Sequence, residues 1–280
     1  MYISGFDANR AKRKPIILRP EQTLLDARNT MIRYSISRVV VAKNRKPVGI
    51  VTEKDMARFM YQEVPTRGLG EIRLDEVMSK ALITVDPETD LRICARTMLG
   101  NHISSLLVVD SKDTLKGIIT KTDLTAAYEE YFVFEHKVEE FMTKKVVTVA
   151  PDEPIHSAIM LMDKNQLSRI VVAKNRRLVG IITGRDLLTL GAYFGTPGHQ
   201  RKKKDYPFIP SGVKAFMITT DVMTANPITT TLDSDLVEAA FIMLGNRISG
   251  LPVVDSKGLL AGIVTKTDVV RALGSHADSI

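Results

Sequence analysis

The sequence predicts an α/β protein built from four copies of one strand-helix-strand-strand-helix unit. The pattern Gly-Ile-Val/Ile-Thr-x-x-Asp occurs four times and ends at Asp55, Asp123, Asp186 and Asp268. In each copy a glycine opens a short β-branched run, which is typical of a strand, and a threonine ends that run three residues before an aspartate that precedes a helical pattern. Such self-similarity at a period of about 60 to 80 residues indicates a repeat protein.

The elements expected in order follow this unit four times. The first copy is a strand at 15–18, a helix at 24–34, a strand at 37–42, a turn at 43–46, a strand from Gly49 and a helix after Asp55. The corresponding strand, helix, strand and strand fall at 81–85, 91–99, 105–109 and 117–120 in the second copy and at 146–149, 155–162, 169–173 and 180–183 in the third. The last helices of these two copies begin near Asp123 and Asp186, and the fourth copy runs from Ile228 to Leu273.

The four repeats form two kinds, which we call A and B. Repeats one and three (A) share 13 of 19 residues between 37–55 and 168–186, and repeats two and four (B) share 19 of 26 between 98–123 and 243–268. One repeat is too small to bury a good core, whereas a pair has a comfortable domain size. We therefore predict an N-terminal arm at 1–14, a first AB module at 15–135 (repeats 15–63 and 74–128) and a second at 136–280 (repeats 138–190 and 219–273).

Composition narrows the class of protein. The chain has 280 residues, 44% of them hydrophobic, and lacks an apolar run of the roughly 20 residues needed to cross a bilayer. Its N-terminus lacks the apolar middle of a signal peptide, so we expect a cytoplasmic protein. Cys94, the single cysteine, lies in an apolar helical pattern and is expected to be a buried, inert thiol. The net charge of +7 suits anionic partners, and the compact run Arg201–Lys204 is either a solvated loop or a contact for such a partner.

The residues around the repeated corner resemble the CBS domain, named for cystathionine β-synthase. Val222–Thr229, Ser249–Asp255 and the Gly-Ile-Val-Thr-x-x-Asp pattern carry the resemblance, which covers residues 15 to 273. It implies that two repeats pair through their sheets around a pseudo-twofold axis and leave clefts for adenosine-containing ligands. A chain of four repeats is similar to the nucleotide-sensing gamma subunit of AMP-activated protein kinase and its archaeal relatives, so two tandem modules stacked into a disc are expected.

The corner itself allows two interpretations. A threonine followed by an aspartate three residues later at a helix start makes a capping box, which is a purely structural role. Alternatively, the carboxylate accepts both hydroxyls of a ribose, and the helix start offers N–H groups to an anion. On the second interpretation the ribose-binding residues are Asp55, Asp123, Asp186 and Asp268, and the neighbouring hydroxyls and cations are Thr52, Lys54, Thr120, Thr122, Thr183, Arg185, Thr265 and Thr267.

An aspartate repels phosphate, so positive charge must come from elsewhere. The candidates are Arg38 and Arg169, with the hydroxyls of Ser37 and Ser168 beside them; the kinase subunit has a His-Arg pair at this place. Lys54 and Arg185 add charge at the A corners, whereas threonines hold that position in B. The A repeats are thus expected to carry the cations and the B repeats the hydroxyls.

These residues predict a non-catalytic regulatory sensor of AMP, ADP or ATP. No catalytic constellation, metal site or cofactor is expected, because the five histidines are scattered and no serine or cysteine has a base beside it in a repeated context. The expected partners are an adenosine nucleotide, a regulated protein and a second copy of the chain. The alternatives are a nucleic-acid-binding regulator that uses the basic run, and a sensor of another adenosyl ligand such as S-adenosylmethionine.

Overall fold

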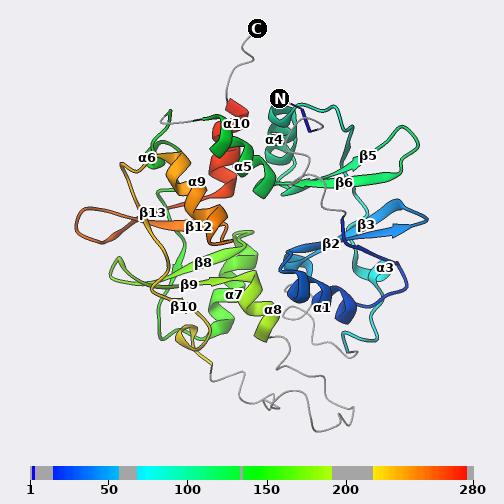
Figure 1. Cartoon of the computed structure of the whole chain (residues 1–280). Coiled ribbons are helices and arrows are strands. Elements are labelled where there is room, and N and C mark those ends of the chain that lie inside the picture. Colours follow the sequence, from blue (N-terminus) through cyan, green and yellow to red (C-terminus); the bar gives the residue numbers. More distant parts are fainter. Residues whose placement is uncertain (1, 4–14, 57–67, 133–134, 191–216, 276–280) are drawn as a thin grey trace. The chain divides into compact units, whose positions relative to one another are not determined.

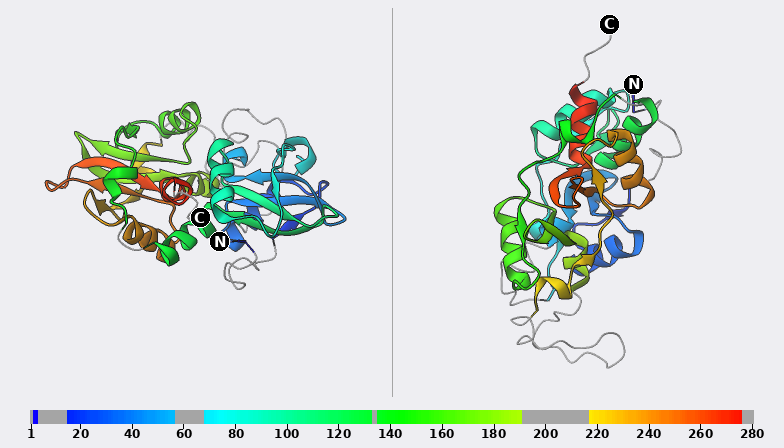
Figure 2. Two further views of the ribbon diagram at one scale, coloured as in Figure 1. Left: turned by 90° about the horizontal axis from the view of Figure 1, so that it is seen from above. Right: turned by 90° about the vertical axis from the view of Figure 1, so that its left-hand side faces the viewer.

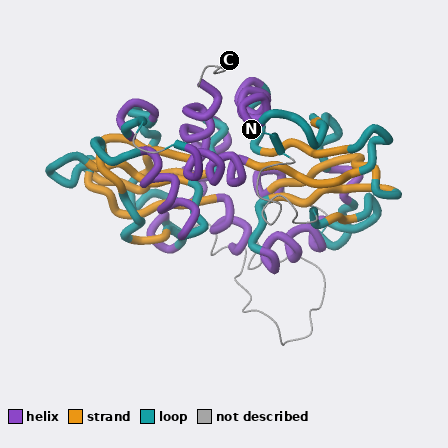
Figure 3. The backbone as a smooth tube through the Cα atoms, turned by 45° about the horizontal axis from the view of Figure 1, so that its top comes forward, coloured by secondary structure: helices purple, strands orange, loops and turns teal. Residues whose placement is uncertain are grey.

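The computed structural model describes residues 2–3, 15–56, 68–132, 135–190 and 217–275 (Figure 1). Within these ranges the predicted unit is present four times, and the α/β fold class is confirmed. In each repeat a short strand leads into a helix, which leads into a two-stranded hairpin followed by a second helix (Figure 3).

The bounds of the elements follow the predicted order closely. The first repeat contains β1 (Ile17–Leu18), α1 (Leu24–Tyr34), β2 (Arg38–Lys43) and β3 (Lys46–Thr52), and a helix begins at residues 53–56. The second contains β4 (Thr84–Val85), α4 (Leu91–Gly100), β5 (Ser105–Val109), β6 (Leu115–Thr120) and α5 (Lys121–Tyr131). The third contains β7 (Thr148–Val149), α7 (Ile155–Lys164), β8 (Arg169–Lys174), β9 (Arg177–Thr183) and α8 (Gly184–Leu190). The fourth contains β11 (Thr230–Thr231), α9 (Leu236–Gly245), β12 (Gly250–Val254), β13 (Leu260–Thr265) and α10 (Lys266–Ser275).

Each repeat forms its own sheet with one shared three-stranded topology, and the sheet of the third repeat gains a fourth strand, β10 (Thr224–Ala225), antiparallel to β9. The short first strand pairs parallel with the middle strand, as Ile17 does with Val40, and the middle strand pairs antiparallel with the last. All four hairpins have a register shift at the same place, shown by Val41/Ala42 in the first repeat. The predicted turn of the first repeat is confirmed, because Asn44 and Arg45 both have positive φ, which suits a tight hairpin turn.

Helix α1 shows how the sequence sets the element bounds. Thr23 and Asp26 form a capping box at its start, and the apolar residues that it buries recur at helical spacing. The helix ends at Ser35, whose left-handed φ of 52° turns the chain out of the helix and towards β2.

The described residues form two compact bodies, each of which joins like repeats. The A body contains Ile16–Ala81 and Val147–Asn226, and the B body contains Met1–Pro15, Leu82–Val146 and Pro227–Ile280. In the B body α4, α5, α9 and α10 pack on one another around one core (Figure 2). The A body has two cores, one mainly from each repeat, and the core of the first repeat also includes Leu188 of the third. The AB modules of the sequence analysis join repeats of different bodies, and that pairing stays a prediction.

Short helical turns between the repeats were not predicted. These are α3 (Leu74–Val77), α6 (Val138–Phe141) and the 3₁₀ turn η2 (Thr219–Asp221). After each turn comes a methionine that lies against the glycine of a hairpin strand, in the pairs Met78–Gly49, Met142–Gly262 and Met223–Gly180. The glycine is needed there, because a Cβ atom at Gly262 would lie 2.6 Å from the Met142 sulfur. Each turn thus ties a connecting segment to a sheet.

The start of the chain packs in a related way. Tyr2 forms a β-bridge with Asp90, as Arg73 does with Thr23. The backbone N–H of Ile3 donates to the carbonyl of Thr89 at 3.1 Å, and Ile3, only 7% exposed, belongs to the core of the B body. The predicted N-terminal arm is therefore docked at residues 2 and 3.

Within the described part of the chain, no helix combines the length and the apolar character that crossing a bilayer requires.

Candidate functional site

The four corners have one local geometry. In each, Oδ2 of the aspartate accepts two hydrogen bonds from the threonine three residues earlier, one from its backbone N–H and one from its hydroxyl. At Asp55 these measure 2.9 and 2.7 Å, and at Asp123, Asp186 and Asp268 all are 2.7 Å. The threonines Thr52, Thr120, Thr183 and Thr265 thus hold the helix starts as the capping interpretation predicts. At Asp55 and Asp186 a ligand would therefore have to bind the second carboxylate oxygen, Oδ1.

The fourth corner differs from the other three. Asp268 is 2% exposed, and its Oδ1 accepts a hydrogen bond of 2.8 Å from Arg271. Burial raises the pKa of this carboxyl group, although the Thr265 hydrogen bonds and Arg271 act in the opposite direction. Both oxygens are therefore engaged within the chain. Asp55, Asp123 and Asp186 are only half-buried.

The predicted cations of the A corners reach across to the other A repeat. Arg185 of the third repeat donates to the carbonyl of Ser35 in the first at 3.1 Å, and Lys54 of the first donates to the side chain of Gln166 in the third. Ser35 and Gln166 hold equivalent positions, since each follows its helix with a φ near +50°, at 52° and 55°. The contacts are thus reciprocal, and each cation reaches the equivalent segment between the first helix and the middle strand of the opposite repeat.

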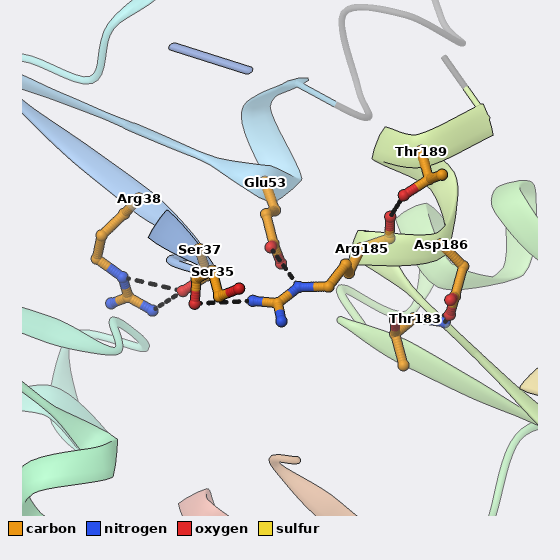
Figure 4. Close-up of polar contacts among 8 residues, drawn as sticks. All are labelled: Ser35, Ser37, Arg38, Glu53, Thr183, Arg185, Asp186 and Thr189. Atoms are coloured by element: carbon orange, nitrogen blue, oxygen red, sulfur yellow. Dashed lines mark hydrogen bonds and ion pairs between the residues drawn. The ribbon is translucent and has the colours of Figure 1, made fainter. Parts of the chain in front are cut away.

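The predicted Ser-Arg pairs are also formed. Arg38 donates to the hydroxyl of Ser37 through Nε at 3.3 Å and through one terminal nitrogen at 3.0 Å, and Arg169 donates to the hydroxyl of Ser168 at 3.1 Å. Figure 4 shows that the guanidinium groups of Arg38 and Arg185, from different repeats, flank the segment Ser35–Ser37. We call Arg38, Arg185 and the Ser37 hydroxyl the arginine cluster. Two guanidinium groups and a hydroxyl suit an anionic oxygen group.

Glu53 faces this cluster and was missed by the sequence analysis. Its carboxylate lies 3.6 Å from Nε of Arg185, and its side chain is 18% exposed. Burial raises its pKa, and the charges of Arg185 and Arg38 partly offset that effect. A Cβ atom at Gly184 would lie 3.7 Å from Cβ of Glu53, so the equivalent positions 53 and 184 of the two A repeats lie next to each other. The only signal for Glu53 was its difference from the other repeats, which have Lys121, Gly184 and Lys266 at this position.

The B corners correct one expectation. Lys121 donates to the hydroxyl of Thr267 at 3.0 Å, and Lys266, 7% exposed, donates to the hydroxyl of Thr122 at 3.1 Å. The interpretation that only the A repeats carry cations is therefore wrong. The B cations stand one residue earlier in the corner and bind the predicted hydroxyls of the opposite B repeat.

A small cavity of about 70 Å³ lies beside the arginine cluster. It is lined by Met31, Ile32, Ser35, Glu53, Arg185, Leu188 and Thr189. Ligand pockets usually measure about 300 Å³ or more, so this space suits water or a small group rather than a nucleoside. Among the described residues no cluster of histidine, cysteine, aspartate and glutamate has the arrangement of a metal site. The basic run Arg201–Lys204 lies outside the described residues.

Comparison with protein families gives a match over most of the chain. The CBS domain matches residues 9–62, 74–130, 138–193 and 219–275. These four stretches coincide with the four repeats, and together they cover well over half of the sequence.

Individual proteins match at full length or in part. The chain is 28% identical to the uncharacterized protein MJ1225 of Methanocaldococcus jannaschii over 272 residues, which cover 92% of this chain and 95% of that one. The crystal structure of MJ1225, proposed to be an archaeal homologue of γ-AMPK, superposes with a TM-score of 0.81 and 25% identity over 95% of this chain and 99% of that one. An uncharacterized protein of Pyrococcus horikoshii, at 20% identity, has a TM-score of 0.63 over 92% of this chain and 95% of that one, and shares the fold.

Proposed function

We propose that this chain, which belongs to the CBS domain family, is a non-catalytic sensor that binds adenosine nucleotides and passes their occupancy to a regulated protein. AMP is the proposed ligand, with ADP and ATP as competitors, and no cofactor or metal takes part. The full-length similarity to MJ1225, itself proposed to be a homologue of γ-AMPK, supports this role.

The observation that carries the proposal is the arginine cluster next to the A corners. In our proposal the ribose hydroxyls bind Oδ1 of a corner aspartate, because Oδ2 is already held by the threonine. The phosphate binds a guanidinium group of an A repeat, either Arg38 or its equivalent Arg169, together with the adjacent serine hydroxyl. Asp55, Asp123 and Asp186 are the ribose sites, whereas at Asp268 a ribose would first have to displace Arg271.

The crossing cations suggest how occupancy is transmitted. Arg185 of the third repeat contacts the first repeat, and Lys54 of the first contacts the third, so a phosphate that engages either residue contacts groups from both A repeats. A ligand shifts a conformational equilibrium only by its difference in affinity between the two states. A nucleotide that bridges two repeats has such a difference, because separating the repeats would break its phosphate contacts.

Calorimetric titration of AMP and adenosine against Arg38→Ala and Arg169→Ala tests this proposal. A lost charge-assisted hydrogen bond costs about 1.5 to 3 kcal/mol, so AMP should bind about 10-fold to 150-fold more weakly at the affected site. Adenosine has no phosphate and should bind as before. Arg177→Ala, an exposed arginine at the far end of β9, is the matched control and should change neither affinity.

Two outcomes would contradict the proposal. If the Arg38 and Arg169 variants weaken adenosine as much as AMP, these residues are structural and do not bind phosphate. If no adenosine compound binds the wild-type chain, the sensor function is wrong. A thermal-shift panel of AMP, ADP, ATP, S-adenosylmethionine, NAD and cyclic dinucleotides separates the candidate ligands, because a ligand at about 100 times its Kd stabilises by about 2.7 kcal/mol. AMP should give the largest shift.

A further inference from the structure

Glu53 places a negative charge where the proposed function requires a positive one. It precedes Lys54 in the first corner, and its carboxylate faces Arg185 of the third repeat, 3.6 Å from Nε (Figure 4). The side chain is mostly buried, and the field of Arg38 also acts on it. Burying a carboxylate is costly unless it is paired, so the arginines are what hold Glu53 in this place.

The equivalent positions show that the fold does not need this carboxylate. Repeats two and four have Lys121 and Lys266 there, and the third repeat has Gly184, yet all four corners keep the same threonine and aspartate geometry. The helix start is therefore capped without Glu53. The glutamate lies beside Gly184 and reaches the cation of the opposite repeat.

We infer that Glu53 is an internal competitor for the ligand's phosphate: its carboxylate holds Arg185 in the arginine cluster, and an anionic ligand binds there by displacing it. This inference rests on the proposed function for the identity of the ligand as a nucleotide, but the anion site itself depends only on the cluster. Through its contact with Arg185, Glu53 determines how strongly the cluster distinguishes ligands by their negative charge.

The competition sets which ligands gain from the cluster. A neutral ligand such as adenosine gains nothing from displacing Glu53, and a singly charged group exchanges one ion pair for another. A phosphate monoester or a diphosphate carries more charge and makes bidentate contacts with guanidinium, so it gains more than the carboxylate loses. The adjacent cavity provides space of solvent size into which the carboxylate can turn. The cluster therefore favours ligands of higher negative charge.

Glu53→Gln in the full chain tests the inference, with inorganic pyrophosphate, AMP and adenosine as calorimetric probes. Removing one like charge next to the bound anion should strengthen pyrophosphate and AMP binding by about tenfold or more, and leave adenosine within about twofold. Adding Arg185→Gln should abolish the gain, since the freed cation is then absent. Glu130→Gln, which removes an exposed carboxylate of the B body, is the control and should change nothing.

The outcomes separate the two proposals. The inference is overturned if pyrophosphate binds the wild type and Glu53→Gln with equal affinity, or if it binds neither protein. This holds regardless of how AMP and adenosine bind. A gain for pyrophosphate without any binding of AMP or adenosine supports the anion site and contradicts the proposed nucleotide function. Glu53→Asp keeps the charge but withdraws it from Arg185, so it should give a smaller gain in pyrophosphate affinity than Glu53→Gln. If Glu53→Gln does not fold, the pyrophosphate affinity of Glu53→Asp decides the question.

Discussion

The contact between Gly262 and Met142 gives a direct test of how the connecting segments are held. A methyl group at position 262 would lie 2.6 Å from the Met142 sulfur and 3.0 Å from the carbonyl oxygen of Thr143. The sulfur belongs to a flexible side chain and can move. The carbonyl cannot easily move, because Thr143 and Ile263 exchange two backbone hydrogen bonds of 2.9 and 3.0 Å.

Gly262→Ala should therefore push the segment after α6 away from β13. Overpacking of this kind costs about 1 to 3 kcal/mol. For a chain of this size each kcal/mol lowers the melting temperature by about 2 to 4 °C, so a fall of several degrees is expected. Thermal unfolding followed by circular dichroism measures it.

Two further variants make the test specific. Gly245→Ala, at the end of α9, meets no atom within 4 Å and should be neutral or slightly stabilising. Met142→Ala opens space beside position 262, so the double variant should lose less stability than the sum of the single variants, by about 0.5 kcal/mol or more. A Gly262→Ala protein that melts with the wild type, or strict additivity in the double variant, would refute this account.

Three other side chains give predictions about stability and reactivity. Burial raises the folded-state pKa of Glu53, so the stability that its protonated form contributes is present below the usual pKa and is lost as the pH rises through the folded value. At pH 7, Glu53→Gln should therefore unfold at a higher urea concentration than the wild type, with no gain near pH 4. An equal gain at both pH values would contradict the pKa argument. Arg271→Met removes the partner of buried Asp268 and should lower the free energy of unfolding by about 1 to 2 kcal/mol at pH 7, a modest loss because the arginine is half-exposed and screened by solvent. In acid the loss should be smaller, because Asp268 is then protonated. A loss that does not depend on pH would show that the ion pair is not the cause. Burial raises the pKa of the Cys94 thiol to about 12, so Ellman's reagent should modify it only after unfolding, and rapid labelling of the native chain would disprove its burial.

The sequence predicts most of the fold because local chemistry defines its elements. The bounds of α1 and β5 match the expected residues, since helical periodicity, capping residues and β-branched runs all end at the same places. The turns α3 and α6 were missed because four residues are too few to show a period. Their position depends on docking against a distant glycine, which no local pattern reveals.

For the site, the sequence identifies the repeated residues but not their partners. The threonine and aspartate of each corner lie three residues apart and form the predicted hydrogen bonds. In contrast, Lys121 meets a residue 146 positions away, and Arg185 meets one 150 positions away. Which repeats meet is a property of the tertiary structure. For that reason Glu53, Lys121 and Lys266 could not be assigned from one repeat alone.

The pairing of like repeats explains why the A repeats resemble each other and the B repeats resemble each other. When two equivalent surfaces meet around a twofold axis, residue i of the first contacts residue j of the second, and residue j of the first contacts residue i of the second. Arg185 with Ser35 and Lys54 with Gln166 form one such set in the A body, and the two crossed lysine-threonine pairs form another in the B body. Each repeat must therefore fit its own kind.

The same symmetry makes one exception informative. Position 53 is glutamate in the first repeat, and its equivalent in the third repeat is Gly184. Gly184 has no carboxylate, so the third repeat contributes no negative charge at this position. The competitor is therefore present on only one side of the A body. An anion bound by Arg169 and Lys54 therefore faces no equivalent carboxylate, and Glu53→Gln should change anion affinity at the Arg38 side alone. The gain in pyrophosphate affinity from Glu53→Gln should then remain when Arg169→Ala is added. It should shrink when Arg38→Ala is added.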